Sequence, residues 1–327
     1  MGITLLDSIG HAQLPTSRHF RIEKLADGVY AAIHKPGGYG ICNAGIVDLG
    51  EKTLIFDPFI SPEAARDLLR AAEALTSYPV AYVVNSHFHN DHIRGNQVFA
   101  PPATVISTTR TRELIAQHEP EAIAAEKDYA PKRLKQFQAA LQAEQDSLKR
   151  RELSLMVDYF QALAESNPQL KVTLPNQTFD TQLILRGKDR TVKLISYGKG
   201  HTESDLIMIL PKEKIVFTGD LLFIDHHPYL ADGFPEEWIA ALNNIGKLEP
   251  EILVPGHGPV GQREDISTMI GYIEMTDRLT RQIIREGKPI EILSGLTPPH
   301  PYDTWLLSTF FIPNLRFMYQ RARGEVK

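Results

Sequence analysis

The sequence predicts an α/β fold in which two strand-rich halves flank a helical insert. Residues 28–57 alternate short apolar segments with turns that contain Gly and Pro, which is typical of a β-meander. A helix and a continuous apolar segment follow, an order typical of a sheet with helices packed outside it. Strand patterns return between residues 179 and 223, after a stretch at about 109–168 that is poor in glycine. No repeat or low-complexity tract divides the chain, so we expect residues 1–327 to form a single domain.

The first half contains a clear helix start at Ser61-Pro62-Glu63. Serine is a favoured N-cap and proline is favoured at the first helical position, so these residues predict a helix over 63–75. The segment VAYVVNSH at residues 80–87 then predicts a buried strand.

The stretch at about 109–168 predicts a helical insert. It is rich in Ala, Gln, Glu, Lys and Leu, and apolar residues such as Phe137 and Leu141 recur near helical spacing. Pro120 and Pro131 are expected to separate its helices, because proline removes a helical hydrogen bond. An amphipathic helical hairpin packed on the core is the simplest interpretation, and a mobile cap over a site is the alternative.

The second half predicts strands, then helices. The strands are expected at residues 179–187, 190–198, 205–211, 214–223 and 251–256, and the helices at 235–248 and about 262–287. Residues from about 262 to 327 form a helical and aromatic extension, which we expect to pack on the body of the protein or on another subunit. The sequence is compatible with a homo-oligomer formed through this stretch.

Composition excludes several classes of protein. The formal net charge of −5 gives no electrostatic attraction to nucleic acid or to an anionic membrane. Cys42 is the only cysteine, which excludes an intramolecular disulfide and a thiolate metal cage. No signal peptide is recognisable, and no segment reaches the ~18 apolar residues of a spanning helix. We expect a cytoplasmic protein with a small-molecule substrate.

The segment His87-Phe88-His89-Asn90-Asp91-His92 follows the predicted buried strand. Imidazole and carboxylate groups are the ligands that Zn²⁺ and Fe²⁺ prefer. In an extended segment His87 and His89 point the same way and can bind one metal ion. Asp91 and His92 lie beyond the bend, where they can face a second ion.

Three later positions complete the pattern, each at the end of a predicted strand. They are His201 after Gly200, Asp220 after Gly219, and His257 between Gly256 and Gly258. Glycine beside a ligand allows close approach of the backbone.

Together with the HxHxDH segment, these residues resemble the metallo-β-lactamase fold superfamily over about residues 23–261. The resemblance implies a four-layer αβ/βα sandwich with two divalent metal ions between the sheet edges. Zinc is expected first, and iron or manganese is the alternative. The implied ligands are His87, His89 and His201 for one ion, Asp91, His92 and His257 for the other, and Asp220 for both. Asp91 and Asp220 are the implied catalytic carboxylates.

The expected activity is hydrolysis by a hydroxide that bridges the two ions, whose charge lowers the pKa of water towards ~7. The expected substrate is a small ester, thioester, lactone or amide. Phe223 stands where many metallo-β-lactamases carry a lysine, which argues against a dedicated β-lactamase. The alternatives are an iron-dependent sulfur dioxygenase, a phosphodiesterase, and a non-catalytic metal-stabilised binding protein.

Supporting residues are also expected around this centre. Asp57 follows a strand and can orient a ligand imidazole, or it can cap a turn. Tyr39, His227 and Tyr229 are the expected substrate contacts, and a third metal site at His226-His227 is a weaker alternative. The insert is expected to lie near the mouth of the site, because it begins soon after His92 and ends before His201.

Overall fold

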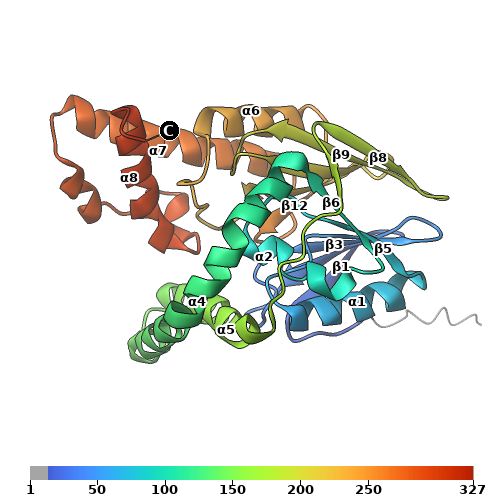
Figure 1. The fold of residues 1–327 in the computed structure, drawn as a ribbon. Coiled ribbons are helices and arrows are strands. Elements are labelled where there is room, and N and C mark those ends of the chain that lie inside the picture. Colours follow the sequence, from blue (N-terminus) through green and yellow to red (C-terminus); the bar gives the residue numbers. More distant parts are fainter. Residues whose placement is uncertain (1–13, 327) are drawn as a thin grey trace, which may run out of the picture.

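The computed structural model describes residues 14–326 and contains two β-sheets that face each other (Figure 1). The first sheet has seven strands in chain order: β1 (Phe20–Ala26), β2 (Val29–His34), β3 (Ala44–Asp48), β4 (Thr53–Phe56), β5 (Val80–Val84), β6 (Thr104–Thr108) and β7 (Gln177–Phe179). The second sheet has five strands in the order β12-β11-β10-β9-β8: β12 (Ile252–His257), β11 (Ile215–Phe223), β10 (Asp205–Leu210), β9 (Thr191–Gly198) and β8 (Gln182–Arg186).

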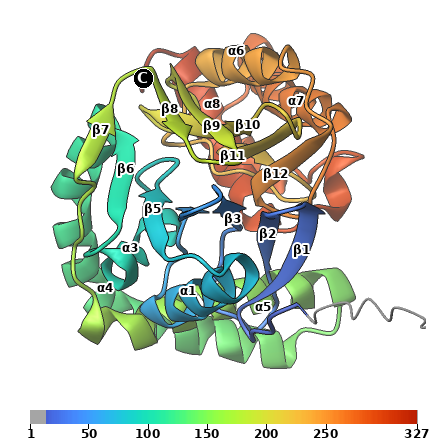
Figure 2. The ribbon, with the colours of Figure 1, turned by 90° about the vertical axis from the view of Figure 1, so that its right-hand side faces the viewer.

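Helices cover the outer face of each sheet, which gives four layers (Figure 2). Helix α1 (Pro62–Thr76) lies outside the first sheet, and α6 (Pro235–Gly246) and α7 (Glu264–Arg285) lie outside the second. The inner faces pack on each other through buried side chains, among them Phe56 and Phe217, whose ring centroids are 5.9 Å apart. The four-layer α/β sandwich is therefore confirmed.

Helix α1 begins as its sequence predicts. The Ser61 Oγ accepts a hydrogen bond from the Ala64 amide (3.1 Å), and Pro62 occupies the first turn. An N-cap of this kind contributes about 1 kcal/mol. The helix buries Leu68 and several alanines against the first sheet, which fixes the strand that carries the HxHxDH segment.

The insert consists of α4 (Thr109–Ala143) and α5 (Ser147–Ser166), which pack side by side. The expectation that Pro120 and Pro131 separate helices is wrong, because α4 runs through both. Glu119 and Glu126, on either side of Pro120, both bind the buried guanidinium of Arg94. These ion pairs and the packing on α5 outweigh the cost of an internal proline, about 3 kcal/mol.

One predicted strand proves to be two. Residues 179–187 were expected to form a single strand, but β7 and β8 belong to different sheets and the chain crosses between them at residues 180–181. Neither residue is Gly or Pro, so no turn signal marks the crossing. Strand β6 and the short helices α2 (Asn90–Ile93) and α3 (Asn96–Phe99) lie where no element was predicted.

The C-terminal residues pack on the body of the same chain. Three 3₁₀ turns lead to α8: η2 (Ile290–Gly295), η3 (Tyr302–Thr304), η4 (Ser308–Phe310) and α8 (Phe311–Ala322). Trp305 stacks on Tyr272 of α7 with ring centroids 5.5 Å apart, and α8 packs along α7. Within residues 14–326, no helix has the length and apolarity that crossing a membrane requires.

Candidate metal centre

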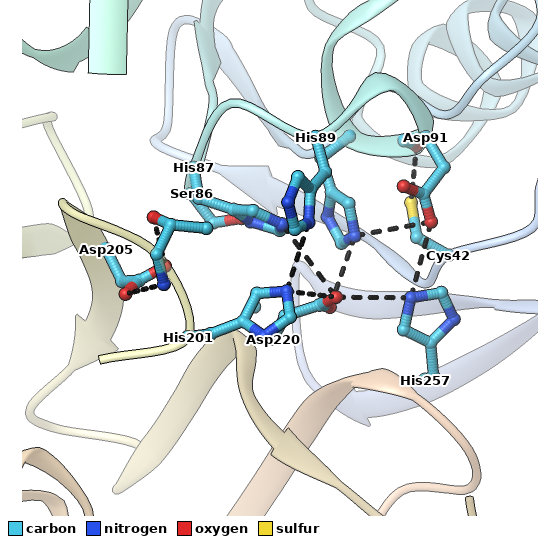
Figure 3. Close-up of polar contacts among 12 residues, drawn as sticks. Cys42, Ser86, His87, His89, Asp91, His201, Asp205, Asp220 and His257 are labelled. Atoms are coloured by element: carbon cyan, nitrogen blue, oxygen red, sulfur yellow. Dashed lines mark hydrogen bonds and ion pairs between the residues drawn. The ribbon is translucent and has the colours of Figure 1, made fainter. Parts of the chain in front are cut away.

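The seven implied metal ligands meet at one edge of the sandwich, where strands of both sheets end (Figure 3). The first sheet contributes the loop after β5 and helix α2, and the second contributes the β9–β10 loop, β11 and the end of β12. The loop after β5 carries His87 and His89, and α2 carries Asp91 and His92. In the second sheet, His201 lies in the β9–β10 loop, Asp220 in β11 and His257 at the end of β12.

The first group of potential ligands contains His87, His89, His201 and Asp220, whose ligand atoms all lie within 4.8 Å of one another. The His201 Nε2 is 3.0 Å from the His89 Nδ1 and 3.4 Å from the Asp220 Oδ2. The His87 Nε2 lies 3.8 Å from the same carboxylate oxygen. Figure 3 shows the three imidazoles turned towards Asp220.

The second group contains Asp91, His92 and His257, again within 4.8 Å of one another. The Asp91 Oδ2 is 3.3 Å from the His257 Nε2 and 3.5 Å from the His92 Nε2. Asp220 reaches this group too, because its Oδ1 is 3.2 Å from the His92 Nε2 and its Oδ2 is 3.4 Å from the His257 Nε2. Asp220 therefore contacts both groups.

Unpaired buried atoms show that the two groups fit metal ions. The His87 Nε2, the His92 Nε2 and the Asp220 Oδ1 are buried and have no hydrogen-bond partner among the described residues. Such atoms are rare in folded proteins and require an explanation. Imidazole nitrogens and carboxylate oxygens are ligands for Zn²⁺, Fe²⁺ and Mn²⁺, so divalent ions at these positions would satisfy them.

Burial and neighbouring charges prepare the side chains for this role. Burial lowers the pKa of His87 well below its usual value and that of His201 to about 3, which keeps both rings neutral. Burial opposes ionisation of Asp220, but the His257 and His92 imidazoles hold its pKa well below the usual range. Against the effect of burial, the carboxylates of Asp91 and Asp220 raise the pKa of His257 to about 9 and that of His92 well above its usual value. Neutral imidazole and ionised carboxylate are the forms that bind metal ions, so a metal ion would displace a proton from these two rings.

Asp57 orients a ligand imidazole, one of the two roles expected for it. Its Oδ2 accepts a hydrogen bond from the His92 Nδ1 (2.8 Å), and its Oδ1 accepts one from the Ser86 amide (2.7 Å). The first bond leaves the His92 Nε2 with its lone pair directed at the centre. Asp57 has a left-handed backbone (φ 52°), a costly conformation for a residue other than glycine.

Two further carboxylates, which sequence analysis missed, hold the first group. The Asp232 Oδ2 lies 3.1 Å from the His89 Nε2, and Asp205 accepts hydrogen bonds from the amide and hydroxyl of Thr202. Burial raises the pKa of Asp205 to about 7. Asp232 lies 143 positions from His89, so no local pattern could have shown it. Asp205 lies close to His201 in the sequence, and that proximity was a usable signal.

Asn43 joins the two sheets beside the centre. Its side-chain amide donates to the carbonyls of Pro255 (3.0 Å) and Gly258 (2.9 Å), which flank the ligand His257. Its Oδ1 accepts a hydrogen bond from the His34 amide (3.2 Å) in the first sheet. Gly256 is required for space, because a Cβ there would lie 1.8 Å from the Asp220 Oδ1.

The structure corrects two of the three expected substrate contacts. His227 is fully buried, with its ring nitrogens 2.9 Å from the Tyr272 hydroxyl and 3.1 Å from the Tyr302 carbonyl. It therefore holds the C-terminal segment and cannot pair with His226 in a third metal site. Tyr39 is also buried, packs in the core of the first sheet, and does not line the cavity at the metal centre. Tyr229 does line it.

A cavity of about 1320 Å³ opens onto the centre and is lined by His89, Asp220 and His257. Its other walls include residues of α4 and α5, of the C-terminal segment at residues 304–313, and of the first sheet and its loops at residues 21–43. The insert therefore lies at the mouth of the site, as its position in the sequence predicts.

A family model described as "Metallo-beta-lactamase superfamily" matches residues 37–257, more than half of the chain. The chain belongs to the metallo-beta-lactamase superfamily. Among curated members of this superfamily, "Metallo-beta-lactamase type 2" of Bacillus cereus is 34% identical over 91 residues, which are 26% of this chain and 36% of that protein. The protein of the same name from Bacillus sp. (strain 170) is 33% identical over 91 residues, 26% of this chain and 35% of its own length. The matches thus span about a third of these relatives.

Structures of superfamily members share the fold. A metallo-beta-lactamase from Pontibacter korlensis gives a TM-score of 0.57 at 18% identity, covering 78% of this chain and 99% of its own. The DIM-1 metallo-beta-lactamase gives 0.56 at 17% identity, covering 79% and 98%. About a fifth of this chain is therefore additional to the fold of these neighbours.

Proposed function

We propose that this protein is a hydrolase that uses two divalent metal ions, zinc in the first instance, to cleave a carbonyl substrate such as an ester, thioester, lactone or amide. The observation that carries the proposal is the position of Asp220, whose two oxygens contact imidazoles of both ligand groups. A carboxylate placed in this way can bind two ions and fix their separation.

The side chains of this centre would divide the work. When bound, the two ions would supply hydroxide at neutral pH and polarise the substrate oxygen. Asp57 and Asp232 would hold the His92 and His89 rings in the orientation that metal binding needs. The cavity would position the substrate carbonyl over the centre and exclude large polymers.

Elemental analysis and a substrate panel test the proposal. We expect two zinc ions per chain after reconstitution, and hydrolysis of at least one carbonyl class that a chelator abolishes and zinc restores. A reconstituted protein with fewer than two ions, or a two-zinc protein inactive on every carbonyl class, would overturn it. The panel includes a phosphodiester, and iron in the native protein would favour the dioxygenase alternative.

A further inference from the structure

We call the part of the cavity lined by the metal ligands its polar end, and the part lined by the insert and the C-terminal segment its apolar end. The polar end holds the groups that face the metal site, among them Asp220 and His257. The apolar end lies between the insert and the C-terminal segment, and its walls include Ala122, Met156 and Phe310. The total volume of about 1320 Å³ exceeds the range of roughly 300–1,000 Å³ usual for small-ligand pockets.

The apolar end is built from the helical insert and the C-terminal segment, which lie outside the two sheets. Phe137 of α4 and Phe160 of α5 line it, and their rings stack with centroids 5.2 Å apart. Leu307 lines the opposite wall, on the C-terminal segment. The Ser308 amide beside it donates a hydrogen bond to the Glu152 carboxylate of α5 (2.5 Å), which joins the two walls.

Charged groups of the insert also line this end of the cavity. Glu119 is paired with the buried Arg94, and the exposed Arg133 lies over the Phe137 ring at 5.5 Å. Arg151 is exposed as well. Apolar surface that is open to water and continuous with a reaction centre is typical of a ligand site.

We propose that the apolar end is an acyl-chain subsite, so that the substrate is a carbonyl compound with a hydrocarbon chain longer than a few carbons. The proposal rests on the proposed hydrolase function and specifies its substrate class. Water adds to the acyl carbon, the bond to the leaving oxygen or sulfur breaks, and that atom takes a proton. The products are a fatty carboxylate and an alcohol or thiol.

A ladder of p-nitrophenyl esters, from acetate to decanoate, tests this with the zinc-loaded full chain. Burial of a methylene contributes about 0.8 kcal/mol, so we expect kcat/KM to rise by up to about fourfold per methylene. Ala122→Trp, which fills the subsite, should abolish the rise with chain length. The matched control is Ala124→Trp on the exposed face of the same helix, which should keep the full rise.

Calorimetry with decanoate and acetate gives a second measurement that does not need turnover. Decanoate should bind the parent and the Ala124→Trp protein more tightly than acetate does, and the Ala122→Trp protein should show no such difference. If Ala122→Trp does not fold, Met156→Ala enlarges the subsite instead and should favour the longest esters.

The failures of the two proposals are distinguishable. Hydrolysis of acetate with no increase along the ladder, or a ladder unchanged by Ala122→Trp, overturns the acyl-chain subsite and leaves the hydrolase. A two-zinc protein that hydrolyses no ester, thioester, lactone or amide, yet binds decanoate in a manner blocked by Ala122→Trp, overturns the hydrolase and supports the subsite.

Discussion

The two ends of the cavity are built in different ways. At the metal end, the ligands lie at strand ends, in loops or in the short helix α2. Most of them are buried, and the buried carboxylate of Asp57 fixes the His92 imidazole. At the insert end, long and largely exposed helices are attached to the sandwich by a few buried polar contacts. Arg94 with Glu119 and Glu126 is one of these contacts, and Asp158 with the Gly37 amide is another.

This difference predicts that the metal end determines the rate of the reaction and that the insert end determines which substrate binds. The sandwich places the ligands with a precision that loops on helices could not supply, because its strands pack on each other over their whole length. Helices attached at a few points can change length and side chains without disturbing those strands. We therefore expect variants of the metal end to change turnover, and variants of the insert end to change stability or substrate choice.

The largest effect is expected from Asp220→Ala, which removes the carboxylate whose oxygens contact imidazoles of both ligand groups. Two-metal catalysis supplies several kcal/mol, so hydrolysis should fall by about 10³-fold or more. Elemental analysis should show fewer than two ions per chain, while circular dichroism stays near the parent's. Near-parental turnover of this variant would refute the assignment of Asp220.

Detaching the insert end should cost the most stability. Arg94→Met leaves two buried carboxylates unpaired, and breaking a buried ion pair costs about 3–5 kcal/mol. Arg110→Met is the matched control, because its partners Glu113 and Glu203 are exposed and such pairs contribute about 0–1 kcal/mol. Urea unfolding measures both, and equal losses in the two variants would contradict the anchoring role of Arg94.

Asp232→Asn should have a smaller effect, confined to the metal end. Its carboxylate orients the His89 ring, and loss of such a partner typically costs 10–100-fold in metal affinity or activity. Competition with a chromophoric chelator measures the affinity. Glu236→Gln is the control, since Glu236 pairs instead with Arg321 on α8 and should bind zinc as the parent does.

The smallest effect is a pH dependence at the insert end. Burial raises the pKa of Asp158 from 3.8 to about 6, against the opposing hydrogen bond from the Gly37 amide. The His34 Nε2 is 4.0 Å away, and burial lowers the pKa of His34 to about 3, so that ring is neutral. Between pH 3.8 and about 6, the Asp158 carboxyl is protonated in the folded state and ionised in the unfolded state, so the folded state binds more protons. The contribution of Asp158 to the free energy of unfolding therefore grows as the pH falls through about 6.

Comparison of the parent with Asp158→Asn isolates that contribution. The parent should lose stability relative to the variant as the pH rises through about 6, because only the parent acquires a buried charge. Urea unfolding at several pH values gives the difference. A constant difference across this range would show that Asp158 does not titrate with the shifted pKa.

The sequence predicted which side chains come together at the metal end, because its signals are local. His87 to His92 lie together, and glycines mark His201, Asp220 and His257. The insert end was predicted less well, because its structure depends on contacts between distant residues. Pro120 argued for a helix break, but the ion pairs of Glu119 and Glu126 with Arg94 and the packing on α5 keep α4 continuous.

Substrate contacts were the least predictable part of the site. Tyr39 and His227 had suitable side chains and suitable places in the sequence, but both are buried. The hydrogen bonds of His227 reach Tyr272 and Tyr302, at separations of 45 and 75 residues. No local pattern distinguishes a histidine that faces a cavity from one that faces the core. Asp232 was missed for the same reason.

The Asn43 amide has a mechanical consequence. The ligands of the second group come from opposite sheets, Asp91 and His92 from one and His257 from the other. The Asn43 side chain donates hydrogen bonds to the carbonyls of Pro255 and Gly258, which flank His257, and accepts one from the His34 amide at the end of β2. It therefore cross-links the two sheets a few residues from the centre. Thermal sliding of one sheet over the other is therefore resisted where it would stretch the ligand set. Motions elsewhere in the sandwich should therefore change the distance between the two groups of metal ligands very little.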